Sequence, residues 1–166
     1  MGGQDSEVLL IMEPYTKSAR ITGMPRGTTV IYDRTIKSEH PPPRAGIVAG
    51  RGVGLTAMES WCTRDCAVAL AKIRGERTVI VSLYMDIKER VVNDKLASLM
   101  DMLDKKGYPI IMGIDSNAHS CLYGPTNNAR GDAFEDFINR HGFAEKTWGH
   151  VQHTRLGERM ALQELT

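Results

Sequence analysis

The segment of residues 110–120, IIMGIDSNAHS, constrains the fold of this chain more than any other. Its residues are apolar or glycine up to Ile114, as in a buried strand. Polar side chains then crowd the point where the strand ends: Asp115, Ser116, Asn117 and His119. A carboxylate and a carboxamide at a strand end can hold a hard divalent cation and a phosphate together, because the amide donates a hydrogen bond without adding repulsion. The segment therefore favours a metal-dependent phosphoesterase.

The composition is that of an ordinary globular protein. The 166 residues are 42% hydrophobic and carry a net charge of +1, so we expect one sizeable core in a single domain over residues 1–166. Any nucleic-acid contact must then come from local basic patches. No apolar run is long enough to span a membrane, and no membrane partner is expected. Cys62, Cys66 and Cys121 lack zinc-type pairing, which indicates buried thiols of a reducing, intracellular compartment.

Apolar runs and turn residues predict alternating strands and helices. Strands are expected at 7–12, 28–32, 45–49, 67–73, 78–84 and 110–114, and helices at 86–106 and about 133–140. The residues of 74–77 are expected to join two strands into an antiparallel hairpin, whereas 15–27 and 50–54 are expected to be loop and turn. This alternation predicts an α/β layered sandwich.

Two acidic residues follow expected core strands. Glu13 comes after the strand 7–12 and Asp115 after the strand 110–114, so each carboxylate is expected at a sheet edge. Mg²⁺ is usually held by one or two carboxylates with phosphate and water, and this pair is therefore a candidate magnesium site. Taken alone, Glu13 is more typical of a solvated or helix-capping side chain.

Three further side chains are candidates for phosphate contact, each with a structural alternative. Tyr84 ends the strand 78–84, where its phenol could hydrogen-bond a scissile phosphate or lie half-buried in the sheet. Arg130 is expected just before the second helix and could pair with a phosphate or with Asp132. His119 suggests a substrate contact, although an isolated histidine is more often a structural residue.

Several motifs occur in a fixed order along the chain. They are Glu13-Pro14, Arg44-Ala45-Gly46-Ile47, Cys62-Thr63-Arg64-Asp65-Cys66-Ala67-Val68, Val81-Ser82-Leu83-Tyr84, Gly113-Ile114-Asp115-Ser116-Asn117-Ala118-His119-Ser120 and Asn128-Ala129-Arg130-Gly131. Together they resemble the endonuclease/exonuclease/phosphatase superfamily, and among its members the apurinic-endonuclease-like endonuclease domain of non-LTR retrotransposon polyproteins. The resemblance covers nearly the whole chain.

The resemblance implies a four-layer α/β/β/α sandwich of the DNase I-like class and phosphodiester hydrolysis with Mg²⁺ or Mn²⁺. It implies that the substrate is target DNA, nicked in the nucleus to prime reverse transcription, with a reverse transcriptase domain downstream in the natural polyprotein. By position, Glu13 would bind the metal and Tyr84 would contact the phosphate. Asp115 would orient or deprotonate the attacking water, and Asn117 would hold the phosphoryl oxygen.

The chain departs from the family pattern at its ends. The family begins with a strand carrying an asparagine near the metal and ends with an Asp-His pair, and we expect this chain to lack both, as an incomplete fold. Its last residues resemble the start of an aspartate-bearing strand with Glu164 in the aspartate position, so Glu164 is a further candidate metal ligand.

Three functions remain open from the sequence. The first is the DNA endonuclease. The second is a superfamily phosphatase that acts on a small phosphoester or an inositol phosphate, and the third is a catalytically dead fragment that still folds or binds DNA weakly. A cluster of basic residues favours a polyanion as ligand: Arg20, Arg26, Arg34 and Lys37.

Overall fold

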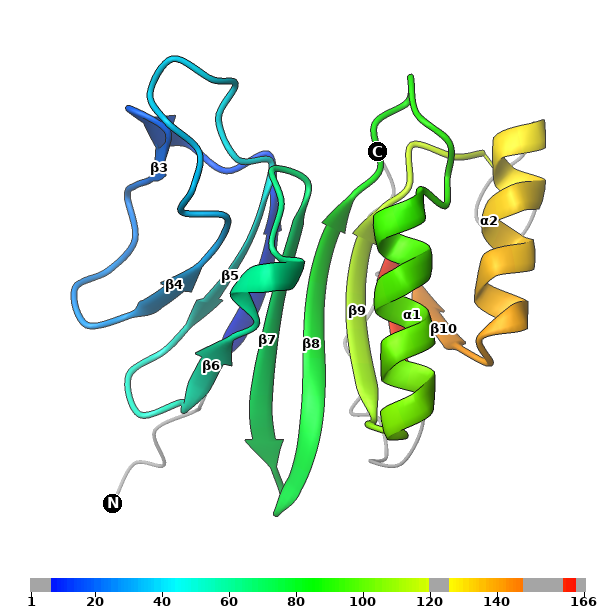
Figure 1. Cartoon of the computed structure of the whole chain (residues 1–166). Helices are drawn as coiled ribbons and strands as arrows, with labels where there is room; N and C mark the ends of the chain where they lie inside the picture. Colours follow the sequence, from blue (N-terminus) through cyan, green and yellow to red (C-terminus); the bar gives the residue numbers. More distant parts are fainter. Residues whose placement is uncertain (1–6, 120–125, 148–159, 164–166) are drawn as a thin grey trace. The chain divides into compact units, whose positions relative to one another are not determined.

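The computed structural model describes residues 7–119, 126–147 and 160–163, shown as the coloured ribbon in Figure 1. The chain divides into two compact units, Met1–Ser82 and Leu83–Thr166. The division falls inside strand β8 (Glu76–Tyr84), so the last two residues of that strand belong to the second unit. The expectation of a single domain over the whole chain stays a prediction.

The first unit is built from short and mostly antiparallel strands. Strand β5 (Ala45–Ala49) lies between β1 (Val8–Met12) and β4 (Thr29–Ile31) and is antiparallel to both, with Leu10 and Val30 opposite Ile47 and Val48. The other elements of the unit are β2 (Thr16–Lys17), β3 (Arg20–Ile21), β6 (Leu55–Ala57), the 3-10 helix η1 (Glu59–Trp61), β7 (Cys66–Ile73) and β8.

Small side chains let the two layers of strands in this unit pack closely. Ile31 and Ile47 from the first layer share one buried cluster with Ile80 and with alternate alanines of β7: Ala67, Ala69 and Ala71. At Gly46 an added Cβ would lie 2.6 Å from the Cδ1 atom of Ile21, so a larger residue at this central strand position would require the Ile21 side chain to move. The hydroxyl of Ser82 donates to the carbonyl of Ile11 at 3.1 Å, which joins β8 to β1.

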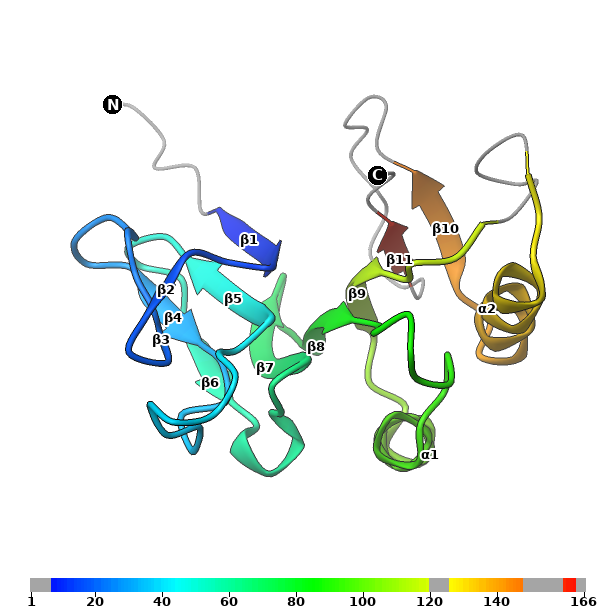
Figure 2. The ribbon, with the colours of Figure 1, turned by 90° about the horizontal axis from the view of Figure 1, so that it is seen from above.

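The second unit consists of parallel strands covered by helices. In order across the sheet, the strands are β9 (Ile110–Asp115), β11 (Met160–Gln163) and β10 (Ala144–Thr147), all parallel. Helices α1 (Asp94–Lys106) and α2 (Ala129–Arg140) lie along the same face of these strands, as the view in Figure 2 shows. The unit's core is made of large apolar side chains: Leu96, Leu99, Met100, Leu103, Ile110, Met112, Ile114, Phe134, Phe137, Ile138 and Phe143.

All six expected strands are present, with ends within two residues of those predicted. The hairpin is present as well, since β7 and β8 are neighbours that run in opposite directions in Figure 1 and turn at Arg74 and Gly75, both with positive φ. The segment 15–27, expected to be loop, contains the small ladder of β2 and β3. Its two-residue strands are too short to give a periodic sequence pattern.

Both helices begin at positions other than those expected. Helix α1 begins at Asp94, because the Asp86 side chain and carbonyl accept from nearby backbone N–H groups in a turn and Asn93 caps the helix through Leu96 N (2.9 Å). Helix α2 begins at Ala129, because the Asn128 side chain accepts from Gly131 N at 2.8 Å. The expectation that Arg130 precedes the second helix is therefore wrong, and Arg130 lies in its first turn.

The structure bears on the expectations about the cysteines and about membrane spans. Cys62 and Cys66 are buried and form no disulfide, as expected, while Cys121 lies outside the described residues. Neither of the two α-helices described has the length and apolar composition of a membrane span.

Candidate active site

Glu13 lies where the sequence predicts, immediately after β1 in the first unit. Its side chain is exposed, and its backbone has φ of +48°, a left-handed conformation that is uncommon outside glycine. The Glu13 N–H donates to the carbonyl of Arg44 at 2.7 Å. Strained backbone of this kind clusters at functional sites, and here a hydrogen bond holds it in place.

Arg44 connects three of the motifs noted in the sequence. Its guanidinium forms a two-pronged ion pair with Asp65, with Nε to Oδ1 at 2.6 Å and Nη2 to Oδ2 at 2.8 Å. Its backbone N–H also donates to the carbonyl of Arg64, so the ends of β1, β5 and the turn before β7 are fastened together. Glu13 is thus hydrogen-bonded to the main chain of a residue whose side chain forms a mostly buried ion pair, with the two side chains 14% and 23% exposed.

In the second unit, the ends of β8 and β9 lie side by side. The N–H of Met85, which follows Tyr84, donates to the carbonyl of Asp115 at 2.8 Å. The Asn117 amide Nδ2 donates to the carbonyl of Met85 at 3.1 Å, and the Asn117 N–H donates to Asp115 Oδ1 at 3.2 Å. A carboxylate, a carboxamide and a phenol therefore lie at the C-terminal ends of β8 and β9. The residues that carry them, Asp115, Asn117 and Tyr84, are all half-buried.

Asn117 is the second candidate residue with left-handed backbone, at φ of +46°. Asparagine tolerates this conformation better than most residues, because its short polar side chain can hydrogen-bond locally. The two hydrogen bonds to Asp115 and Met85 fix both its backbone and its side chain. This strand end is therefore a preorganised group of polar atoms rather than an open loop.

Arg130 holds this edge together through main-chain oxygens. Its Nε donates to the carbonyl of Ser116 at 2.9 Å, and Nη1 donates to that of Glu89 at 2.6 Å. Its Nη2 donates to the carbonyls of Met85 at 3.1 Å and Asp86 at 2.9 Å. The planar guanidinium thus bridges the segments that follow β8 and β9 from the first turn of α2.

Burial and nearby charges act on the Arg130 guanidinium in opposite directions. Burial lowers the pKa of the Arg130 guanidinium from its ordinary value, while the charges of Asp86, Asp115, Glu89 and Tyr84 act in the opposite direction. Asp115 and Tyr84 are therefore close enough to interact electrostatically with this cation. The guanidinium supplies positive potential beside the acidic strand end as well as its hydrogen bonds.

The glycine of the Arg-Gly motif has a steric explanation. A Cβ at Gly131 would overlap the carbonyl oxygen of His119, because the loop after β9 passes directly over the first turn of α2. The same His119 carbonyl accepts from Asn128 N at 3.0 Å. The His119 ring is exposed and lies 3.4 Å from the Thr126 hydroxyl, so its described contacts are with the helix start rather than with Asp115.

The structure thus gathers four of the candidate side chains in one unit: Tyr84, Asp115, Asn117 and Arg130. Glu13 belongs to the other unit, and Glu164 lies outside the described residues. The roles assigned to these residues stay predictions. Sequence reasoning did not find the main-chain binding by Arg130 or the Arg44–Asp65 pair, although both lie in the quoted motifs.

The donors at this edge are compatible with a hard divalent cation. Within residues 7–119, 126–147 and 160–163, no three His, Cys, Asp or Glu side chains come together as a metal-binding group. Mg²⁺ does not need such a cage, because it is commonly bound through one or two carboxylates together with substrate phosphates and water. Asp115, a half-buried carboxylate with one oxygen already oriented by Asn117, is a donor of this kind.

An α/β fold whose polar residues follow neighbouring strands is the arrangement of the DNase I-like class of phosphoesterases. The chain is similar to the solved structure of the endonuclease domain of TRAS1, a telomere-specific non-LTR retrotransposon, with a TM-score of 0.62 and 22% sequence identity. The similarity covers 81% of this chain and 58% of that one, so this chain spans less than two thirds of that domain. At this identity the likeness shows the fold, and the expected α/β fold of the DNase I-like class is confirmed.

Residues 78–158 match the endonuclease-reverse transcriptase family. No curated protein matches the sequence. The resemblance drawn from the motifs, to the endonuclease/exonuclease/phosphatase superfamily and to non-LTR retrotransposon endonuclease domains, is confirmed by the family match and the structural match. The matched segment includes the ends of β8 and β9 and the start of α2, where the candidate site lies.

Proposed function

We propose that this chain is a metal-dependent phosphodiesterase that nicks DNA. The observation that carries the proposal is the group formed by Tyr84, Asp115 and Asn117 at one sheet edge, held by the Arg130 guanidinium. The family match over 78–158 and the likeness to a retrotransposon endonuclease domain support this reading. Mg²⁺ or Mn²⁺, when bound, would supply Lewis-acid stabilisation of the charge that develops on the phosphate.

Each residue of the group has a separate task in this proposal. Asp115 accepts a proton from the attacking water, whose oxygen bonds to phosphorus as the P–O3′ bond breaks, and the released 3′ oxygen takes its proton from solvent. Asn117 presents its amide to a non-bridging phosphoryl oxygen, and Tyr84 donates its phenolic hydrogen to the same phosphate. The bond between Asn117 N–H and Asp115 Oδ1 keeps the carboxylate in one orientation before substrate arrives. Glu13 and Glu164 are the proposed metal ligands.

The biological setting belongs to the same proposal. As the motif resemblance implies, the nick would be made in target DNA, and its 3′ end would prime reverse transcription by a domain further along the polyprotein; the match to an endonuclease-reverse transcriptase family supports this setting. Such a protein would act on chromosomal DNA in the nucleus. Arg130 and His119 would contact the DNA beside the scissile phosphate.

Relaxation of supercoiled plasmid by the purified chain tests the proposal. We expect nicking with Mg²⁺ and none with chelator. The Asp115→Asn variant should reduce the rate by roughly 10²–10⁴-fold, because it removes the proton acceptor while keeping the shape of the side chain. The matched control is Asp101→Asn, since Asp101 is an exposed acid on α1.

The possible results separate the proposed activity from its alternatives. Metal-independent nicking, or equal rates for Asp115→Asn and the wild-type chain, would contradict it. Hydrolysis of a small phosphoester with intact plasmid would favour a phosphatase. Unchanged plasmid from a folded chain would identify a domain that has lost its activity.

A further inference from the structure

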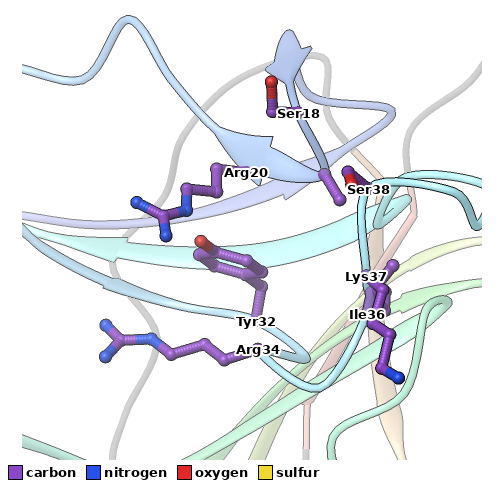
Figure 3. Close-up of a pocket in the computed structure, with 8 residues that line it drawn as sticks. Ser18, Arg20, Tyr32, Arg34, Ile36, Lys37 and Ser38 are labelled. Atoms are coloured by element: carbon purple, nitrogen blue, oxygen red, sulfur yellow. The ribbon is translucent and has the colours of Figure 1, made fainter.

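The first unit carries a basic pocket that the proposed active site does not use. It has a volume of about 820 Å³ and is shown in Figure 3. The wall is formed by the turn between β2 and β3 and by the segment that follows β4. Six of its residues carry polar or charged groups: Ser18, Arg20, Tyr32, Arg34, Lys37 and Ser38.

The pocket is positively charged and has no acidic residue in its wall. Arg20, Arg34 and Lys37 are exposed, and no carboxylate in the described part of the chain forms an ion pair with any of them. Asp33, which is nearby in the sequence, is not part of the wall, and its Oδ1 accepts from the backbone N–H and hydroxyl of Thr35, at 2.9 and 2.6 Å. The positive charge is therefore available to a ligand.

An aromatic ring organises the two arginines. In Figure 3 the side chains of Arg20 and Arg34 extend in the same direction on either side of the half-buried Tyr32 ring. Arg34 lies with its Cζ atom 6.0 Å from the ring centroid, and its Nη2 donates to the carbonyl of Val30 at 3.1 Å. Arg34 is thus positioned before a ligand arrives, which lowers the entropic cost of binding.

The turn between β2 and β3 sets the position of Arg20. Ser18 and Ala19 both have left-handed backbone, with φ of +50° and +57°, and Ala19 is buried. This tight turn places Arg20 at the start of β3, where the register pairs it with Lys17. The basic side chains therefore project from a turn with defined backbone geometry rather than from an unstructured loop.

We propose that this pocket binds the phosphodiester backbone of duplex DNA, with Arg20 and Arg34 each contacting a phosphate. This inference takes its ligand from the proposed function and assigns to that ligand a second contact surface. Two guanidinium groups flanking a phenol present several N–H and O–H donors to anionic oxygens. Three separate cations around 820 Å³ fit a polyanion better than one phosphate group. The pocket would bind DNA through its phosphates and would not discriminate between base sequences.

Fluorescence anisotropy with a labelled duplex, in chelator so that no hydrolysis occurs, tests the proposal. The Arg20→Gln/Arg34→Gln variant should lower the slope of log K against log salt by about 1.8, since each phosphate contact contributes about 0.9. Loss of two such contacts weakens binding by roughly 60-fold at about 0.1 M salt. The Arg20→Lys/Arg34→Lys variant keeps the charge and should retain most of the slope.

The matched control removes the same charge elsewhere in the unit. Lys72 and Arg77 are exposed residues of the β7–β8 hairpin, and Lys72→Gln/Arg77→Gln should leave the slope within about 0.3 of wild type. An unchanged slope in the Arg20→Gln/Arg34→Gln variant, or an equal loss in the control, would overturn the proposal. Absence of duplex binding by the wild-type chain would overturn it too, and capture of thymidine monophosphate in its place would assign the pocket to small phosphoesters.

The binding assay and the nicking assay can fail independently. A slope change in chelator from a chain that nicks no plasmid with Mg²⁺ would refute the proposed function and leave this pocket as a DNA-binding surface. Nicking that depends on Asp115, with an unchanged slope for the Arg20→Gln/Arg34→Gln variant, would support the proposed function and overturn the DNA-binding role of this pocket. Circular dichroism of each variant confirms that the chain is folded.

Discussion

Replacing Arg130 with methionine removes four hydrogen bonds to main-chain oxygens while keeping most of the side-chain volume. The four do not contribute equally. Glu89 is exposed, so water replaces its lost donor, and the Met85 carbonyl still accepts from Asn117 Nδ2. The bond to the carbonyl of Ser116, a fully buried residue, contributes most.

We therefore expect Arg130→Met to lower the free energy of unfolding by about 2 kcal/mol. A hydrogen bond from a charged donor to a buried acceptor contributes roughly 1.5–3 kcal/mol, and the remaining bonds add a few tenths each. Burial of the guanidinium offsets part of this gain, as its lowered pKa shows. For a chain of this length the loss lowers the melting temperature by roughly 4–8 °C.

Urea unfolding followed by circular dichroism measures the change directly. Arg130→Lys keeps the charge but not the planar fork, so it should recover less than half of the lost stability. Arg140→Met, at the exposed end of the same helix, is the control and should cost no more than about 0.5 kcal/mol. An Arg130→Met chain as stable as wild type, or full recovery by lysine, would refute the bridging role.

Two other substitutions test the packing around the candidate residues. Gly131→Ala should destabilise the chain by roughly 1–3 kcal/mol in urea unfolding, because its Cβ overlaps the His119 carbonyl; stability equal to wild type would contradict that close approach. Arg44→Met leaves the mostly buried Asp65 carboxylate without its ion pair and should cost about 2 kcal/mol in the same assay. A double variant with Asp65→Asn should restore part of this loss, and additive losses would show that the two side chains act separately.

The strands of this fold are largely predictable because their apolar residues are continuous. The run from Ile110 to Ile114 has no competing interpretation, and the buried strand is where the sequence places it. The start of α1 was misplaced for a different reason. Val91 and Val92 continue the helical spacing backwards, but the cap at Asn93 and the turn at Asp86 end the helix first.

The sequence predicts which residues form the site, but it does not predict the hydrogen bonds that hold them together. The ends of the strands identify Tyr84, Asp115 and Asn117 as neighbours, because residues that follow adjacent strands meet at one sheet edge. The partners of Arg130 lie as far as 45 positions away in the sequence, and a main-chain carbonyl leaves no signature in the residue that carries it. The requirement for glycine at position 131 is likewise set by the His119 carbonyl, twelve positions away in the sequence.

The partners of Arg130 have a consequence for how this domain can diversify. Every acceptor of its guanidinium is a backbone oxygen, and every amino acid presents the same oxygen at that place. The exposed side chains of 87–89 can therefore change without loss of the bonds that hold the segment. Arginine 130 itself has no such freedom. One fixed residue thus leaves the surface beside the candidate site open to variation.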